Sequence, residues 1–406
     1  MKVGWQTKTL GELAEVFADG DWVESKDQST EGVRLIQTGN VGEGFFKDRG
    51  DKARYISEAT FKRLRCTEIF EGDCLISRLP DPVGRCCLLP DTGERMITAV
   101  DCTIVRFDSK QIIPVFFNYY SQSTDYLDAV DAETSGTTRN RVSRANLGKI
   151  AVPVPPLPEQ QRIVGILDAA FEGIATAKAN AEQNLQNARA LFESHLQSVF
   201  TQRGEGWIEK PLGELCERIT KGSSPKWQGI SYVDTPGILF VTSENVGEYQ
   251  LLMDSPKYVE EKFNSKDKKS ILKNGDVLTN IVGASIGRTA VFNLDDVANI
   301  NQAVCLIRCE PSLLNNYYLA YLLNSPVFKQ VLHSNEVNSA RANLSLGFFS
   351  QLTVPLPSLA EQRAVVAKLD VFREETQRLE SLYQRKLAAL DELKKSLLHQ
   401  AFSGAL

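Results

Sequence analysis

Polar side chains of the kinds that bind nucleic acids occupy short loops at matched places in the two halves of the chain. Gln37 and Asn40 bound the loop Gln-Thr-Gly-Asn, and Asn245 ends the loop Thr-Ser-Glu-Asn at 242–245. Asn and Gln side chains hydrogen-bond to adenine, Arg and Lys to guanine, and small hydroxyl groups to phosphate. These loops therefore suit base edges and phosphates, although each of them alone also fits an ordinary solvated turn.

Arginine-bearing loops recur at a fixed spacing. Residues 135–141 read Ser-Gly-Thr-Thr-Arg-Asn-Arg and residues 337–343 read Val-Asn-Ser-Ala-Arg-Ala-Asn, so Arg139 and Arg341 coincide 202 positions apart. A basic loop at 221–227, Lys-Gly-Ser-Ser-Pro-Lys-Trp, occurs in the second half only. The pairing favours DNA binding, and the candidate residues are Gln37, Asn40, Arg85, Thr137, Arg139, Arg141, Lys221, Lys226, Asn245, Arg288, Ser339 and Arg341.

The sequence has no recognisable catalytic constellation. Histidine occurs only at 195, 333 and 399. Residues 283–289, Gly-Ala-Ser-Ile-Gly-Arg-Thr, are one residue short of a phosphate-binding loop and have Arg288 in place of its lysine, so a turn is the better interpretation. The Asp/Asn-Pro-Pro-aromatic tetrapeptide of an amino-methyltransferase is also missing. We therefore expect a non-catalytic chain that binds no metal and no cofactor itself.

Composition favours a cytoplasmic globular protein. The 406 residues are enough for two or three domains, and 42% are hydrophobic and 24% charged. The sequence shows no signal-peptide pattern and no apolar run near the ~18 residues of a membrane helix. Eight cysteines without a Cys-x-x-Cys pair indicate buried reduced thiols. A net charge of −5 argues against a simple basic DNA clamp but is compatible with a base-reading protein whose partners supply much of the phosphate contact.

The chain is an internal repeat with a period near 202 residues. Trp5 and the run Leu-Gly-Glu-Leu at 10–13 return at Trp207 and 212–215. The offset drifts to 205 and 203 for Asn-Val-Gly, Gly-Asp and Gly-Arg and then returns to 202, as small loop insertions would cause. Because the sequences between these anchors differ widely, we expect one scaffold that presents two different surfaces.

Each half begins with an α+β, mainly sheet, globular segment. Apolar β-rich runs predict strands at 33–36, 74–77, 85–89 and 102–107, and again at 238–241, 277–280, 289–292 and 303–308. One helix is expected at 115–130 and one at 313–332, followed by a short strand at 150–154 or 352–356. The predicted boundaries are 1–152 for the first globular domain, 153–203 for a Pro-rich segment and first long helix, 204–354 for the second domain and 355–406 for the second helix.

The two long helices carry matching apolar stripes. Apolar residues recur at steps of three and four over at least four heptads. The stripe of the second helix is bulky and that of the first is Ala-rich, so large side chains would face small ones in one intramolecular coiled coil. The alternative is two independent amphipathic helices. The predicted seam comprises Ile163, Leu167, Ile174, Leu191, Val365, Leu369, Phe372, Leu379, Tyr383, Leu390, Leu393 and Leu397.

Connectivity predicts that the helices pair antiparallel. A 42-residue helix is about 63 Å long, and a parallel pair would force the second globular domain to bridge that length. Antiparallel pairing places the end of the first helix beside the start of the second. The two halves would then be related by an approximate twofold axis.

With these motifs the chain resembles the specificity subunit (HsdS) of Type I restriction–modification enzymes. The resemblance rests on the Trp…Leu-Gly-Glu-Leu segments at 5–13 and 207–215, the Pro-x-Pro-x-Leu-x-Glu-Gln segments at 153–160 and 355–362, and Ser-Gly-Thr-Thr-Arg at 135–139, and it covers the whole chain. There are two departures, Ser358 and Ala360 in place of Pro156 and Pro158, and a 337–341 loop without Gly-Thr, so the resemblance does not imply that the two domains contact DNA in the same way.

The resemblance implies a DNA-binding subunit in which each target-recognition domain binds one half of a bipartite site in double-stranded DNA. The helices would set the gap and dock two modification (methyltransferase) subunits, and restriction (nuclease-translocase) subunits would join them. S-adenosylmethionine, ATP and Mg are then expected in the partner subunits. The alternative is a coiled-coil scaffold whose globular domains bind protein or carbohydrate; a self-contained methyltransferase is disfavoured by the missing motifs.

Overall fold

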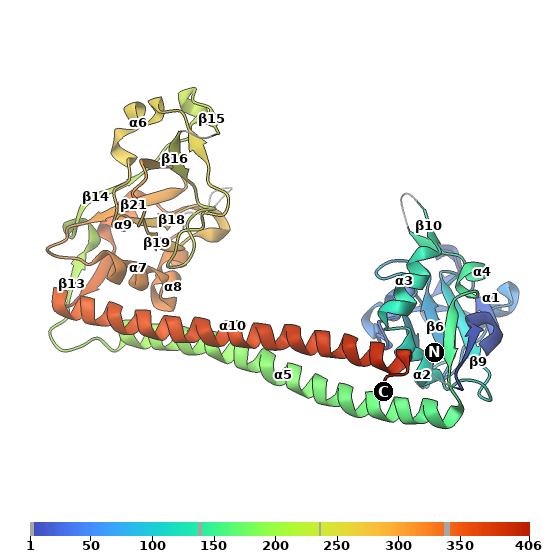
Figure 1. Ribbon diagram of the computed structural model, residues 1–406. Helices are drawn as coiled ribbons and strands as arrows, with labels where there is room; N and C mark the ends of the chain where they lie inside the picture. The colour runs from blue at the N-terminus through green and yellow to red at the C-terminus, as the bar shows by residue number, and fades with distance from the viewer. Residues whose placement is uncertain (1–3, 137–139, 235–236, 337–341) are drawn as a thin grey trace. The chain divides into compact units, whose positions relative to one another are not determined.

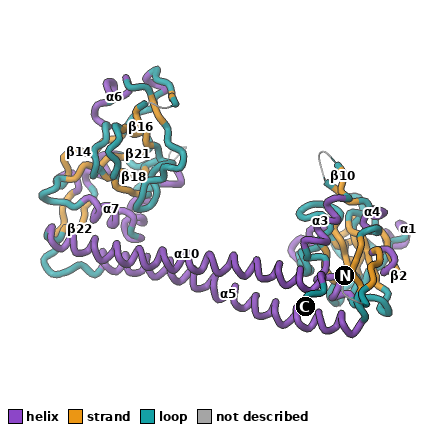
Figure 2. The backbone as a smooth tube through the Cα atoms, viewed as in Figure 1, coloured by secondary structure: helices purple, strands orange, loops and turns teal. Residues whose placement is uncertain are grey.

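The computed structural model describes residues 4–136, 140–234, 237–336 and 342–406 (Figure 1). The chain forms two compact units, one of residues 1–182 with 385–406 and one of residues 183–384. Each unit contains one globular domain and one paired stretch of the two long helices (Figure 2).

The globular domain of the first unit contains two four-stranded sheets. One has the order β2-β9-β6-β7 and is antiparallel throughout, whereas the other, β3-β5-β4-β8, pairs β4 and β8 in parallel. The bounds are β2 Ala14–Asp19, β3 Gln28–Ser29, β4 Val33–Ile36, β5 Arg54–Ile56, β6 Cys74–Ser77, β7 Cys86–Leu88, β8 Met96–Thr98 and β9 Cys102–Phe107. β4 and β6 are buried at every position, and three of the four residues in each are apolar, which is why both appear in the sequence as mainly apolar runs.

Two further strand pairs complete this domain. β1 (Gln6–Thr9) pairs antiparallel with β12 (Ala151–Val154) and so joins the first strand to the Pro-rich segment. β10 (Thr134–Ser135) and β11 (Arg141–Val142) form a short hairpin. The helices are α1 Glu58–Leu64, α2 Pro114–Tyr120, α3 Thr124–Ala132 and α4 Arg144–Leu147.

The globular domain of the second unit repeats this topology. Its sheets have the orders β14-β21-β18-β19 and β15-β17-β16-β20, and β13 pairs with β22. The strands are β13 Ile208–Pro211, β14 Cys216–Lys221, β15 Tyr232–Val233, β16 Ile238–Val241, β17 Tyr258–Val259, β18 Val277–Asn280, β19 Thr289–Val291, β20 Ala298–Ile300, β21 Val304–Cys309 and β22 Thr353–Leu356. The eight apolar runs predicted as strands are confirmed within one residue at each end.

The single helix predicted in each globular domain is wrong, because each is two helices. In the first domain α2 and α3 are separated by residues 121–123, and Ser123 caps α3 by accepting a hydrogen bond from Tyr126 N. In the second domain α7 (Asn316–Asn324) ends before Ser325, which caps α8 (Pro326–Ser334), with Pro326 in its first turn. A serine cap, with or without proline, starts a new helix, and the polar residues at 121–125 and 324–325 interrupt the apolar pattern there. The remaining helices of this domain are α6 Lys262–Lys266 and α9 Leu346–Gln351.

The long helices are α5 (Leu157–Thr201) and α10 (Leu359–Ser403), and a buried glutamine fastens each to its domain. Gln160 accepts a hydrogen bond from Ile113 N at 2.8 Å and donates to the carbonyls of Gln111 and Pro155. Gln362 makes the same three bonds, to Asn315 N and to the carbonyls of Leu313 and Pro357. These contacts explain the repeated Glu-Gln of the Pro-rich motif.

Within each unit α5 and α10 run antiparallel (Figure 1). In the first unit Lys178 pairs with Asp391, and the Arg162 guanidinium donates to the Leu406 carbonyl at 2.9 Å. In the second unit Arg189 Nε lies 3.1 Å from Glu380 Oε2. From Lys178 to Arg189 the residue number rises by 11, and from Asp391 to Glu380 it falls by 11, as antiparallel helices require. The predicted antiparallel pairing is confirmed.

The buried stripe of α5 differs from the predicted seam in its second half. It passes through Ala181, Ala188, Leu196 and Phe200, whereas Leu191 is 53% exposed. On α10, Leu393 is 46% exposed and the neighbouring Leu397 and Leu398 turn inward. The predicted places of Leu191 and Leu393 are therefore wrong, because the helix period of about 3.6 drifts away from a strict heptad. Of the other predicted seam residues, Ile163, Leu167, Ile174 and Leu369 are buried and Val365, Phe372, Leu379, Tyr383, Leu390 and Leu397 are half-buried.

Each globular domain completes its core with the end of a helix from the other half of the chain. In the first unit Leu398 and Phe402 of α10 are buried, and the Phe402 ring lies 5.2 Å from that of Phe116. In the second unit Leu196 and Phe200 of α5 take the equivalent places, with Phe200 5.5 Å from Tyr318. The two contacts use residues 202 positions apart.

Candidate functional site

Arginines and aspartates gather where four segments of the first domain meet: the end of β2, the residue after β6, the turn before β9, and β11 with α4. The set consists of Asp19, Arg78, Asp101, Arg141 and Arg144, hereafter the arginine cluster. Arg78 lies at its centre because its backbone joins the segments on both sides: its N–H donates to Asp101 O at 2.9 Å, and its carbonyl accepts from Val142 N at 3.3 Å. The hairpin β10–β11 is thereby joined to the turn before β9, and the Arg78 side chain reaches Asp19 at the end of β2.

Arg78 is nearly buried, at 5% exposure, and its charge is only partly compensated. One guanidinium nitrogen donates to Val100 O and lies 3.4 Å from Asp19, while Nε has no hydrogen-bond partner among the described residues. Burial lowers the pKa of Arg78, and Asp19 opposes this shift. A buried cation with a free donor is costly unless an acceptor approaches it.

Arg141 and Arg144 present charge outward from the same place. Arg141 lies 2.8 Å from Asp101 and Arg144 3.7 Å from Asp19, and both side chains are about half exposed. A guanidinium held by one carboxylate keeps further N–H donors in fixed directions, which suits a phosphate or a guanine edge. Three arginines against two aspartates leave one net positive charge.

The second domain has no counterpart of this cluster in its described residues. The equivalent positions, 202 or 203 residues later, are Lys221, Ile281, Ala303, Asn343 and Leu346. The only charged member is Lys221, at the end of β14, and it is exposed. The two domains thus differ in charge at a place where their backbone topology is the same.

The second domain concentrates lysines instead, on the loop after β14 and beside α6. Lys221, Lys226, Lys266, Lys268 and Lys269, hereafter the lysine cluster, are all exposed. The buried Asp267 holds the two segments together, since it accepts a hydrogen bond from Ser223 Oγ at 2.5 Å, and Lys266 Nζ donates to Gln228 O at 2.6 Å. Sequence reasoning found Lys221 and Lys226 but missed the other three, although Lys-Asp-Lys-Lys at 266–269 is a visible basic run.

An exposed tryptophan lies in the corresponding loop of each domain. Trp22 is 69% and Trp227 85% exposed. Each follows a glycine, Gly20 or Gly222, at which a Cβ would overlap a backbone carbonyl at the end of β8 or β20. This close approach explains the matched glycines, and it fixes the base of both loops. Flat aromatic rings beside cations are surfaces on which bases and sugars stack.

Arg85 and Arg288, predicted as an equivalent pair, occupy opposite environments. Arg85 is buried and donates to four backbone carbonyls, those of Thr38, Val41, Leu79 and Pro82. Arg288 is exposed. In its domain Asn280 makes part of the contacts that Arg85 makes in the first, by donating to Ser243 O at 2.9 Å and Val246 O at 3.3 Å. Those two carbonyls are the counterparts of Thr38 and Val41, so Arg85 has a structural role and Arg288 is available at the surface.

The candidate asparagines also bind their own loops. Asn40 Oδ1 accepts from Gln37 N at 3.0 Å, and its amide donates to Lys47 O. Asn245 makes the same contacts with Thr242 N and Leu252 O. Both are buried, whereas Gln37 is half-buried. Of the other predicted residues, Thr137, Arg139, Ser339 and Arg341 lie outside the described residues.

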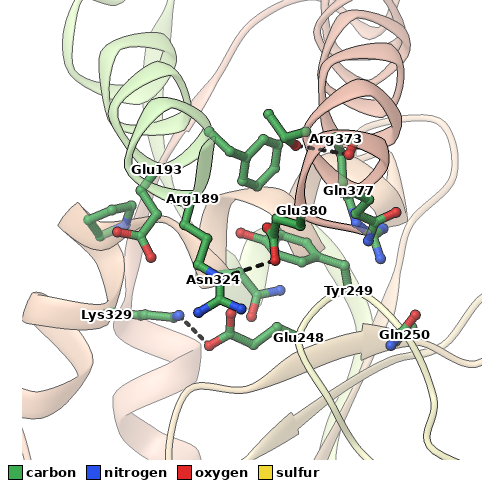
Figure 3. Close-up of a pocket in the computed structure, with 13 residues that line it drawn as sticks. Arg189, Glu193, Glu248, Tyr249, Gln250, Asn324, Lys329, Arg373, Gln377 and Glu380 are labelled. Carbon is green, nitrogen blue, oxygen red and sulfur yellow. Dashed lines mark hydrogen bonds and ion pairs between the residues drawn. The ribbon is translucent and has the colours of Figure 1, made fainter. Parts of the chain in front are cut away.

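A polar cleft of about 460 Å³ lies where α5 and α10 meet the second domain (Figure 3). Its cations are already engaged: Arg189 pairs with Glu380, Lys329 Nζ lies 2.5 Å from Glu248, and the Arg373 guanidinium lies 4.9 Å from the ring centre of Tyr249. The first contact joins α5 to α10, the second joins α8 to Glu248 within the domain, and the third holds α10 against the domain.

Metal-binding clusters and membrane-spanning helices are both absent from the described residues. Outside 1–3, 137–139, 235–236 and 337–341, no group of three or more His, Cys, Asp or Glu side chains is placed to hold a metal ion. No helix in that part of the chain is long and apolar enough to cross a membrane. The eight cysteines are unpaired, and seven of them are buried.

A duplicated mainly-β domain, alternating with antiparallel long helices, is the arrangement of one known family. The family model described as Type I restriction modification DNA specificity domain matches residues 2–187 and 204–386. The chain belongs to this family, and the resemblance stated from the sequence is confirmed.

Individual relatives agree with this assignment. The chain is 27% identical over 317 residues to the specificity subunit of the Type I restriction enzyme EcoBI from Escherichia coli, a match covering 71% of this chain and 65% of that one. It is 22% identical over 321 residues to the MjaVIII specificity subunit of Methanocaldococcus jannaschii, covering 75% and 73%. The match spans just under two thirds of the EcoBI subunit.

Solved structures share the fold. A chain from a structural study of complex assembly and conformational transition of the type I R-M system superposes with a TM-score of 0.82 at 21% identity, over 100% of this chain and 99% of that one. The HsdS subunit of Thermoanaerobacter tengcongensis gives a TM-score of 0.64 at 21% identity, over 100% and 98%. Two mainly-β domains alternating with two long helices are thus this family's fold.

Proposed function

We propose that this chain is the DNA-recognition subunit of a Type I restriction–modification complex, in which each globular domain binds one half of a bipartite target. The observation that supports this most directly is the contrast between the arginine cluster and the lysine cluster. The two domains have one backbone topology and place unlike cations on it, as two half-sites of different sequence require.

The chemistry of the two clusters suggests different modes of contact. The fixed guanidinium groups of Arg141 and Arg144 suit bidentate binding of guanine or phosphate. The flexible ammonium groups of Lys226, Lys268 and Lys269 suit the phosphate backbone, with Trp227 beside them for stacking. The family assignment favours this function over the coiled-coil scaffold that binds protein or carbohydrate.

In this proposal the chain is not itself an enzyme. Two modification subunits would dock on the helices and bring S-adenosylmethionine, and restriction subunits would bring ATP and Mg. Calorimetry of the purified chain with S-adenosylmethionine is expected to show no stoichiometric binding. Stoichiometric binding by the chain alone would contradict this part of the proposal.

Selection from random-sequence double-stranded DNA tests the recognition function, with the chain alone and with co-expressed modification subunits. The expected result is a bipartite consensus with a gap of constant length. Inserting four residues near Asn184, about one helical turn, should change the gap and leave both half-site sequences unchanged. Enrichment of no sequence under either condition would contradict DNA recognition, and an altered half-site with an unchanged gap would contradict the role of the helices.

A further inference from the structure

Two ion pairs connect α5 and α10, and both place the cation on α5. Lys178 pairs with Asp391 in the first unit, and Arg189 pairs with Glu380 in the second, as Figure 3 shows for the latter. The hydrogen bond from Lys178 lowers the pKa of Asp391, so that carboxylate is ionised at neutral pH. Both pairs lie on exposed sides of the helices beside the seam.

These four residues occupy only two positions of the repeat, with the charges reversed. Lys178 and Glu380 are 202 residues apart, and so are Arg189 and Asp391. If a second copy of α5 replaced α10 in the same register, Lys178 would face Arg189 twice. If a second copy of α10 replaced α5, Glu380 would face Asp391 twice. A pairing of two α5 helices or of two α10 helices, hereafter a like-with-like pairing, therefore places like charges together at two positions.

The apolar ends of the helices do not make this distinction. Leu196 and Phe200 end α5 as Leu398 and Phe402 end α10, and each phenylalanine packs on an equivalent aromatic ring of a globular domain. A globular domain that accepts one helix end would accept the other. Discrimination between the two halves must therefore come from the middle of the helices.

We propose that Lys178 and Arg189 form an interface that accepts an α10-type helix, with acids at 380 and 391, and rejects a second α5. The partner that fits this surface is the other half of this chain, in the same molecule or in a second copy. This selectivity concerns assembly alone and does not rest on the proposed DNA binding.

The expected discrimination is modest for each contact and larger in sum. Exposed ion pairs and like-charge contacts each change an association constant by about two- to fivefold. A like-with-like pair exchanges two attractions for two repulsions, so we expect it to be disfavoured by roughly tenfold or more on charge alone. Packing of bulky against small side chains adds to this, and the test must separate the two effects.

The test uses the full chain, cut after folding. A protease site inserted after Gly204, in the exposed turn between α5 and β13, yields fragments that both contribute to each unit and so stay associated. Unlabelled and heavy-isotope preparations are mixed in mild urea until unlike fragments have exchanged fully, which native mass spectrometry shows directly. The same spectra measure the fraction of like-with-like dimers.

Three proteins are compared, the unchanged chain and two charge variants. Because their seams are identical, differences between them report the effect of the charges alone. The double variant K178E/D391K keeps both ion pairs between unlike halves but makes like-with-like pairing attractive. In those dimers the new carboxylate at position 178 would face Arg189, and the new ammonium group at position 391 would face Glu380. The fourfold variant K178E/R189E/E380K/D391K restores the repulsion. Like-with-like dimers should rise roughly tenfold in the double variant and fall again in the fourfold variant. Equal fractions in all three proteins would overturn the proposal.

Discussion

The two globular domains share a scaffold and differ in how they use arginine. In the first domain Arg85 is buried and holds four carbonyls, and Arg78 is buried at the centre of the arginine cluster. In the second domain Arg288 is exposed, Asn280 performs part of the work of Arg85, and Ile281 stands in place of Arg78. A repeated residue thus marks a shared backbone position, and its role depends on which neighbour satisfies the local carbonyls.

The largest difference is expected for removal of the two repeated arginines. Arg85→Ala removes a buried side chain and its four hydrogen bonds to backbone carbonyls, so it should destabilise the first domain by about 3–5 kcal/mol. Arg288→Ala, at an exposed position, should change stability by less than about 0.5 kcal/mol. Urea denaturation of the full chain, with hydrogen exchange of β4 and β6 to localise the effect, measures both. The second-site change Ser77→Asn, which places an asparagine where the second domain has Asn280, should recover part of the loss.

Replacing the two glutamine anchors, Gln160 and Gln362, should by contrast lower the stability of the two units by equal amounts. Gln160→Leu and Gln362→Leu each remove three buried hydrogen bonds and leave their partners unsatisfied, at about 2–4 kcal/mol. Hydrogen exchange at residues 111–113 and 313–315 should rise in the matching unit only. A cost that differs by more than about 2 kcal/mol between the units would show that the anchors are not equivalent.

Replacing Arg141 with alanine should affect only one half-site. If its guanidinium binds a base edge, discrimination at one position of the first half-site should fall by about 1–3 kcal/mol, with the second half-site unchanged. Competition binding with single-base variants of the selected target measures this. Equal weakening on all sequences would instead assign Arg141 to phosphate.

The smallest effect on DNA binding per residue is expected for substitutions in the lysine cluster. The triple variant K226A/K268A/K269A should weaken binding to all sequences and reduce the slope of log K against log salt by up to about 2.7, or ~0.9 for each phosphate that loses its lysine partner. Lys395→Ala, on α10 and paired with Glu392, serves as the control and should leave the slope unchanged. An unchanged slope in the triple variant would remove this cluster from the interface.

Much of the fold was predictable because the repeated residues fulfil fixed backbone requirements. Buried strands such as β6 and β18 need apolar residues that pack in the core, and Gly20 and Gly222 permit a close approach that any side chain would block. The breaks before α3 and α8 were missed although the sequence marks both, with Ser-Gln-Ser-Thr-Asp at 121–125 and Asn-Ser-Pro at 324–326, because the apolar residues on either side were assigned to one helix.

The site was harder to predict, because residue type does not distinguish a structural from a binding role. Asn40 and Arg85 are residue types that bind bases, yet both bond to their own loops. Arg78 was missed because it belongs to no repeated motif, and its position at the cluster comes from long-range contacts with Asp101 and Val142. Such contacts depend on tertiary structure, which spacing along the chain does not reveal.

The contribution of α10 to the first unit has a consequence for synthesis. The core of that unit includes Leu398, Ala401 and Phe402, so the first domain to leave the ribosome cannot complete its core until these residues have been made. About 200 residues separate the end of α5 from this point. At a synthesis rate of roughly 5–20 residues per second, the delay is about 10–40 s. During that interval the surface around Phe116 is exposed, and a nascent chain that stops early leaves it open to chaperones and proteases.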